Sequence, residues 1–130
     1  MWGLATWEPM TINAEPDEIA IQDAIYALDN QTRIGVSLFR PGDTNQDERL
    51  VIVGGQRVNV EYWPAGHSEP THVLTDSYAA ADEVVIISFG EHGTLEYAAS
   101  DTVSQDTAVE AALAFFRSGR INGSHWAHYD

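Results

Sequence analysis

The chain has 130 residues, of which 44% are hydrophobic, and this size and composition predict one folded domain over residues 1–130. Six arginines and no lysine face twenty acidic residues, and the resulting net charge of −14 disfavours direct binding to nucleic acid or to an anionic membrane. The absence of cysteine excludes disulfides, thiolate catalysis and cysteine metal sites.

The N-terminal part predicts a strand followed by a helix. Trp2–Glu8 alternates weakly and places Leu4 on one face of a strand. A cap at Asn13, with Pro16 in the first turn, predicts the start of a helix that ends at Asp29-Asn30. Helical spacing gathers four residues into one apolar stripe that we expect to pack on a sheet: Ile21, Ala24, Ile25 and Leu28.

The middle of the chain is rich in β-forming residues. Five runs predict strands: Ile34–Phe39, Leu50–Val53, Arg57–Trp63, Glu83–Phe89 and Thr94–Ala98. Gly54-Gly55 and Gly90–Gly93 are hairpin signals between consecutive runs. The Arg57–Trp63 run alternates, so its even-numbered residues are predicted to be buried and its odd-numbered residues, including Asn59, to face water.

A second helix is predicted near the C-terminus. Ser104 is its expected N-cap and Gly119 its expected stop. An apolar stripe runs along it: Val109, Ala112, Leu113 and Phe116. A last short strand is expected within His125–Tyr129. Together these elements predict an α+β fold with a mainly antiparallel sheet and both helices on one face.

The stretch Pro64–Asp82 is long for a connection without structure, so it is either functional or contains a short strand around His72–Thr75. Its His67, His72, Glu69 and Asp76 match no zinc motif, and we expect neither a metal nor a cofactor. An alternative hypothesis is a small hydrolase-like enzyme that uses His67, His72 and Asp76 around a cleft. Another is a broad acidic mimic of nucleic acid.

Exposed aromatic and acidic residues instead favour a protein interface. Trp63 and Tyr78 bracket the long stretch, and aromatic residues of this type anchor interfaces. The candidate partner-binding residues are Glu61, Trp63, Glu69, Asp76, Tyr78, Asp82 and Glu83. The structural alternative is that Trp63 covers a sheet edge and Tyr78 packs the loop onto the protein.

Several segments resemble immunity protein family one of bacterial polymorphic toxin systems. The resemblance covers roughly residues 50–130. It is carried by Arg57–Pro64, by Val103-Ser104, by the alanine-rich helix Ala108–Arg120 with its double phenylalanine and Ser-Gly-Arg end, and by Trp126 six residues later. The Ser-capped helix with the following tryptophan is the most specific part.

This resemblance implies a small α+β protein without catalytic activity that binds a secreted toxin and protects the producing cell. The toxins implied are deaminase-fold proteins that act on nucleic acid. Such a toxin needs a basic substrate surface, which a chain at −14 is suited to cover. We therefore expect a cytoplasmic immunity protein, monomeric when free, whose partner is a basic toxin domain.

Overall fold

The computed structural model describes residues 2–7, 10–40, 47–80, 82–123 and 125–129, so the predicted strand position Glu8 lies outside the described residues. Its main sheet is antiparallel and eight-stranded, in the spatial order β10-β6-β5-β4-β3-β1-β2, with β9 paired to β5. These strands are β1 (Gly3–Trp7), β2 (Thr11–Asn13), β3 (Gly35–Arg40), β4 (Glu48–Gly54), β5 (Arg57–Trp63), β6 (His72–Leu74), β9 (Val103–Ser104) and β10 (Trp126–His128).

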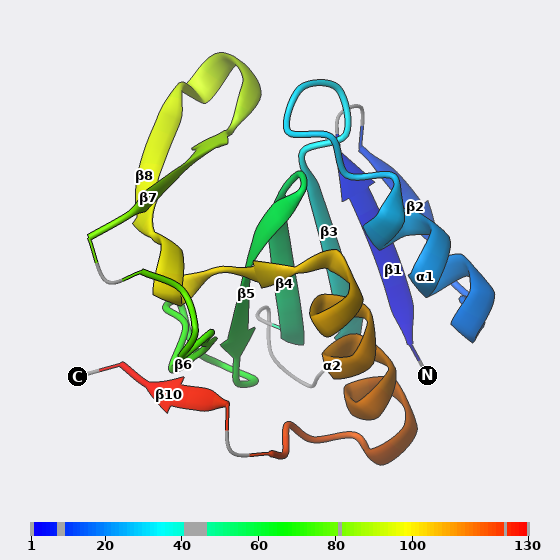
Figure 1. Ribbon diagram of the computed structural model, residues 1–130. Coiled ribbons are helices and arrows are strands. Elements are labelled where there is room, and N and C mark those ends of the chain that lie inside the picture. Colours follow the sequence, from blue (N-terminus) through cyan, green and yellow to red (C-terminus); the bar gives the residue numbers. More distant parts are fainter. Residues whose placement is uncertain (1, 8–9, 41–46, 81, 124, 130) are drawn as a thin grey trace.

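Two helices, α1 (Glu18–Tyr26) and α2 (Gln105–Ser118), cover one face of this sheet (Figure 1). The prediction of an α+β fold with both helices on one face is confirmed. Within the described ranges, no helix has the length and apolarity needed to cross a membrane.

The two helix starts differ in how well the sequence predicted them. The cap of α2 is confirmed, because the Ser104 hydroxyl accepts a hydrogen bond from the Thr107 amide at 3.2 Å. Gly119 ends α2 in the left-handed conformation, as expected. The predicted cap of α1 at Asn13 is wrong: Asp17 caps it by accepting from the Ala20 amide at 2.8 Å, which leaves Pro16 outside the helix.

The hydrophobic core lies between the main sheet and the helices. Phe115 is completely buried there, with its ring edge-on to Trp2 and Tyr62 at centroid distances of 5.1 and 5.9 Å. The other completely buried members of this core come from the strands, from α1 and from α2: Ile21, Ile25, Leu38, Leu50, Ile52, Val58, Val60, Ala108 and Ala112. Leu28 belongs to this core as predicted, although α1 ends before it.

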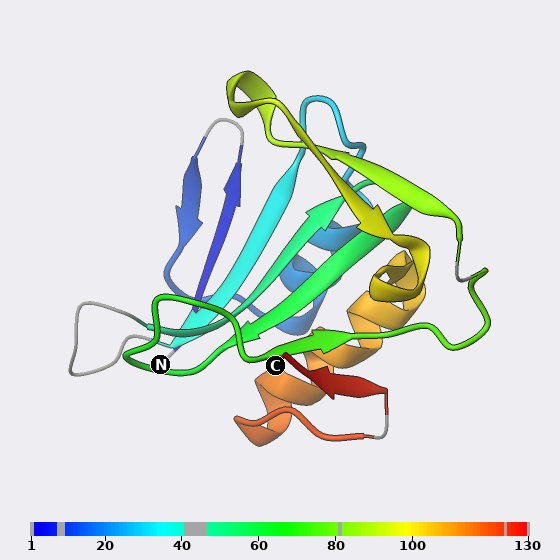
Figure 2. The same cartoon turned by 90° about the vertical axis from the view of Figure 1, so that its left-hand side faces the viewer.

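The strands β7 (Val84–Ser88) and β8 (Thr94–Ala98) form a separate two-stranded sheet, joined by a 3-10 turn η1 (Gly90–His92). The second predicted hairpin is thus confirmed, but it does not join the main sheet. We call residues 82–98 the arm. Figure 2 shows the arm crossing in front of the main sheet, with the helices behind.

The stretch between β5 and the arm contains the short strand β6, which confirms the structured alternative for His72–Thr75. The prediction that Asn59 faces water is wrong, because only 1% of this residue is exposed. The 3-10 turn η2 (Ala99–Asp101) covers it, and the Asn59 amide nitrogen donates to the Asp101 carbonyl at 3.0 Å. Both faces of β5 are therefore partly covered, one by α2 and the other by η2.

Candidate protein-binding surface

The arm carries negative charge without any compensating cation of its own. Its four carboxylates are all exposed: Asp82, Glu83, Glu91 and Glu96. No lysine or arginine occurs in the sequence between Arg57 and Arg117. Because like charges concentrated on one unit create a local field, the arm attracts a positively charged surface.

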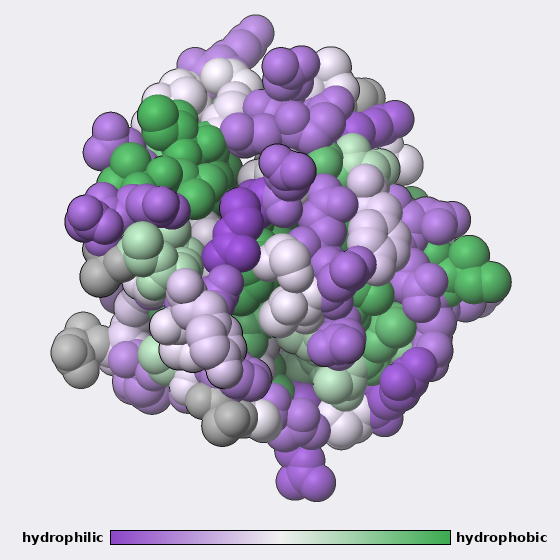
Figure 3. Space-filling model, in the orientation of Figure 1, coloured by the Kyte–Doolittle hydropathy of each residue, from purple (hydrophilic) through white to green (hydrophobic). Residues whose placement is uncertain are grey.

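The same arm exposes apolar side chains. Val84 and Ile86 lie on one face of β7, opposite Ala98 and Glu96 of β8, and are 57% and 55% exposed. Leu95 on β8 is exposed to a similar degree, but it pairs with Ile87 and therefore lies on the other face of the arm. Figure 3 shows an apolar area over the arm, bordered by hydrophilic side chains. An apolar centre with a charged rim is the usual anatomy of a protein interface.

The arm is held in place by Asn30, in the connection between α1 and β3. Asn30 adopts the left-handed conformation with φ at 63°. Its side-chain nitrogen donates to the Ile86 carbonyl at 3.0 Å, and its oxygen accepts from the Ser88 amide at 2.7 Å. Ile87 anchors the inner face of the arm because it is fully buried. The exposed outer face is therefore presented on a fixed support, which lowers the entropy lost on binding.

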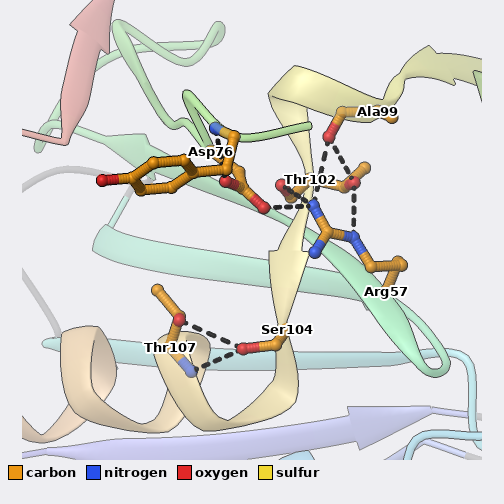
Figure 4. A network of polar contacts seen from close by, with 7 residues as sticks. Arg57, Asp76, Ala99, Thr102, Ser104 and Thr107 are labelled. Carbon is orange, nitrogen blue, oxygen red and sulfur yellow. Dashed lines mark hydrogen bonds and ion pairs between the residues drawn. The ribbon is translucent and has the colours of Figure 1, made fainter. Parts of the chain in front are cut away.

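The loop that leads into the arm is fixed by an ion pair. The Arg57 guanidinium donates to the Asp76 carboxylate at 2.9 Å and to the Thr102 and Ala99 carbonyls at 2.6 and 3.3 Å (Figure 4). The hydrogen bond from Arg57, together with a backbone bond from Tyr78, lowers the pKa of the Asp76 carboxyl. Asp76 thus serves as an internal anchor of the loop.

Tyr78 stands at the surface of this anchored loop. Its backbone amide donates to the Asp76 carboxylate at 3.0 Å, while 97% of the residue is exposed. A tyrosine on a fixed backbone loses little conformational freedom when a partner covers it. Three of the candidate partner-binding residues, Tyr78, Asp82 and Glu83, are therefore exposed along one continuous segment.

The other candidates lie elsewhere. Trp63 ends β5 at the opposite end from Arg57, with the Arg49 guanidinium carbon 4.4 Å from the centre of its ring. Its indole nitrogen is buried without a hydrogen-bond partner among the described residues. Glu69 is exposed in the loop beyond Trp63, and Glu61 is half-buried on the sheet face beneath the arm. The structure therefore divides the candidates into separate groups.

Sequence reasoning missed the apolar part of the arm. Val84, Val85, Ile86 and Ile87 are consecutive, and such a run is typical of a strand buried on both faces. Nothing in this run indicates that the strand pairs only with β8 and leaves one face open. The absence of cations between Arg57 and Arg117 is the signal that could have pointed to this region.

An open groove of about 920 Å³ lies at the tip of the arm. Trp7, Ile34 and Phe89 line it together with the exposed Met10, and Glu91 and His92 contribute polar groups. A hollow with apolar walls at the tip of the arm offers a place for a large side chain of a partner.

The residues of the enzyme hypothesis do not form one cluster. His72 packs on His128 at 4.7 Å, and burial together with the charge of His128 lowers the pKa of its imidazole. Asp76 is occupied by Arg57, and His67 is exposed in a different loop. Across the part of the chain that the structure describes, no group of three or more His, Asp and Glu side chains could hold a metal ion.

No protein-family model and no curated protein matches this chain.

Proposed function

We propose that this chain is an immunity-type inhibitor that binds a cognate toxin and covers its basic, nucleic-acid-binding surface. The arm and the adjoining loop of residues 75–80, which we call the Tyr78 loop, form the contact surface. Inhibition requires no bond making or breaking, because a bound acidic protein excludes the substrate by occupying its place.

The arm carries this proposal. It combines four exposed carboxylates, no lysine or arginine and an exposed apolar stripe on a unit that is tied to the main sheet by Asn30. A nucleic-acid-binding enzyme presents the complementary surface, since it must attract phosphates. The resemblance to immunity protein family one and the α+β fold agree with this reading.

The first test is a binding and inhibition measurement with the toxin domain encoded beside this chain. We expect a complex with a dissociation constant in the nanomolar range, as standard-size interfaces with good anchors reach. Excess chain should abolish the activity of the toxin on nucleic acid. Undiminished toxin activity at saturating chain contradicts the proposal.

Matched variants locate the contact surface. Ile86→Ser removes an apolar group from the arm that is 55% exposed, and Ile19→Ser removes one from α1 that is 67% exposed. Glu83→Gln in the arm is paired in the same way with Glu110→Gln on α2, both at exposed positions. We expect the arm variants to weaken toxin binding about tenfold and the α1 and α2 variants to leave it unchanged. Equal effects within each pair contradict the assignment of the surface.

Selectivity separates an immunity protein from a general mimic of nucleic acid. A panel of unrelated basic nucleases provides the comparison. We expect the chain to inhibit the cognate toxin alone. Contact with the apolar stripe requires a partner surface of matching shape, whereas charge attraction does not. Inhibition of several panel members favours the mimic.

A further inference from the structure

A second polar group of residues lies beneath the arm, on the open face of the main sheet. Glu61 and Asn59 are two residues apart on β5 and therefore share this face. The Tyr129 hydroxyl donates to the Glu61 carboxylate at 2.6 Å. Asp101 of η2 and Tyr97 of β8 are close enough to Glu61 to interact electrostatically with it. We call these five residues the Glu61 cluster.

The Glu61 cluster holds two carboxylates and no cation. Burial raises the pKa of the Glu61 carboxyl, and the charge of Asp101 raises it further, against the hydrogen bond from Tyr129 that lowers it. All six arginines lie within the described residues. The ion pairs among these residues are Arg40–Glu48, Arg57–Asp76 and Arg117–Glu18. Neither Glu61 nor Asp101 therefore has a cationic partner within the described part of the chain.

Asn59 adds an independent sign of an incomplete site. Its amide nitrogen donates a hydrogen bond to the Asp101 carbonyl, and this bond holds the amide group next to Asp101. Its side-chain oxygen is buried and has no hydrogen-bond donor among the described residues. A buried acceptor without a donor is costly, so the cluster has unused capacity to accept hydrogen bonds.

We propose that the Glu61 cluster accepts one arginine side chain of the protein partner. This inference rests on the proposed function, because it names the group by which a basic partner is recognised. A guanidinium carries five donors and a positive charge, which matches two carboxylates and an unused amide oxygen.

The test uses the full chain and the peptide acetyl-Gly-Arg-Gly-amide, with acetyl-Gly-citrulline-Gly-amide as an uncharged peptide of the same shape. The side-chain carboxyl resonances of Glu61 and of the exposed Glu69 are followed by NMR across pH at increasing peptide concentration. We expect the arginine peptide to lower the pKa of Glu61 in a saturable manner. We expect the citrulline peptide to leave Glu61 unchanged and neither peptide to alter Glu69.

Two variants complete the test. Glu61→Gln and Asp101→Asn each remove one charge, and Asp101→Asn leaves in place the carbonyl to which Asn59 donates. We expect each to weaken binding of the arginine peptide about tenfold, as removal of a partly desolvated charge partner does, measured at the carboxyl resonance that remains, Asp101 in Glu61→Gln and Glu61 in Asp101→Asn. Glu69→Gln should have no effect. Identical responses to the two peptides, or an equal response of Glu61 and Glu69, overturn this inference.

The peptide experiment does not involve the toxin, so its result is separate from that of the proposed function. Full toxin affinity of the Glu61→Gln variant removes the arginine site and leaves the inhibitor function standing. Saturable peptide binding without any toxin binding supports the arginine site and contradicts the inhibitor function.

Discussion

The main sheet and the arm both contain strands of apolar, β-branched residues, but these residues are buried in the main sheet and exposed on the arm. Ile52, Val58 and Val60 are fully buried in β4 and β5, under the two helices. Val84 and Ile86 in β7 are just as apolar and β-branched, yet more than half of each is exposed. The two regions differ in what covers them. The helices cover the main sheet, whereas none of the helices and strands that the structure describes covers the outer face of the arm (Figures 1 and 2).

This contrast teaches that apolar composition does not by itself assign a strand to the core. Burial of an apolar side chain stabilises a fold only when other elements remove it from water. The outer face of the arm gains little of this stabilisation. Its apolar side chains are available for a partner, whereas those of the main sheet are not.

The largest effect on stability is expected in the core of the main sheet. Phe115→Ala removes a completely buried ring that contacts Trp2 and Tyr62. We expect a loss of about 3–5 kcal/mol in the free energy of unfolding, measured by urea denaturation. A loss below about 1 kcal/mol would mean that the core collapses around the cavity and that the contrast between the two regions is overstated.

An intermediate effect is expected where the two regions meet. Arg57→Ala removes the hydrogen bonds to Asp76, Thr102 and Ala99 that hold the Tyr78 loop. We expect a loss of about 1–3 kcal/mol in unfolding free energy and faster amide hydrogen exchange at residues 76–79. Unchanged exchange in this loop would show that other contacts fix it. The conservative change Arg57→Lys should restore only part of the loss, because it cannot reproduce the fork of donors.

The acid response distinguishes the two carboxyl groups beside the arm. Asp76 has a lowered pKa in the folded state, so its contribution to stability is present above its ordinary pKa of 3.8 and is lost as the pH falls through the folded value. Glu61 has a raised pKa, so its contribution is present below its ordinary 4.5 and is lost as the pH rises through the folded value. The free energy of unfolding of Asp76→Asn and of Glu61→Gln is measured by denaturation between pH 2 and 7. The two substitutions should change its pH dependence, relative to the unsubstituted chain, in opposite directions.

The smallest effect on folding is expected at the outer face of the arm. Ile86→Ser should change the free energy of unfolding by no more than about 0.5 kcal/mol, since over half of this side chain is already in water. The same urea experiment measures it, with Ile19→Ser as the exposed control. A loss as large as that of Phe115→Ala would show that the arm belongs to the core after all.

The sequence predicts those features that depend on local signals. Ser104 and Gly119 bound α2 because a hydroxyl cap and a residue free to adopt positive φ act within one turn. Gly54-Gly55 mark the first hairpin, and Gly90 and Gly93 at the turn η1 mark the second, for the same reason. Local competition explains the error at α1, where Asp17 offers a carboxylate cap that displaces Asn13.

The candidate surface depends on long-range placement, which one sequence does not show. Asn59 is buried because η2, about forty residues away along the chain, lies over it. Asp76 changes from a candidate contact into an anchor because Arg57 reaches it across the fold. Residue type alone predicts Tyr78, Asp82 and Glu83 as contact residues. The exposed stripe of Val84 and Ile86 cannot be predicted without knowing that β7 pairs with β8 outside the main sheet.

Asn30 has one further consequence for how the chain behaves at high concentration. In an antiparallel pair, alternate residues of an outer strand turn their amide and carbonyl groups away from the partner strand. On β7 the Asn30 side chain occupies two of these groups, the Ile86 carbonyl and the Ser88 amide. A β-strand of another molecule therefore finds these two groups already taken, and the β7 edge of the arm is protected at this point against edge-to-edge growth into aggregates.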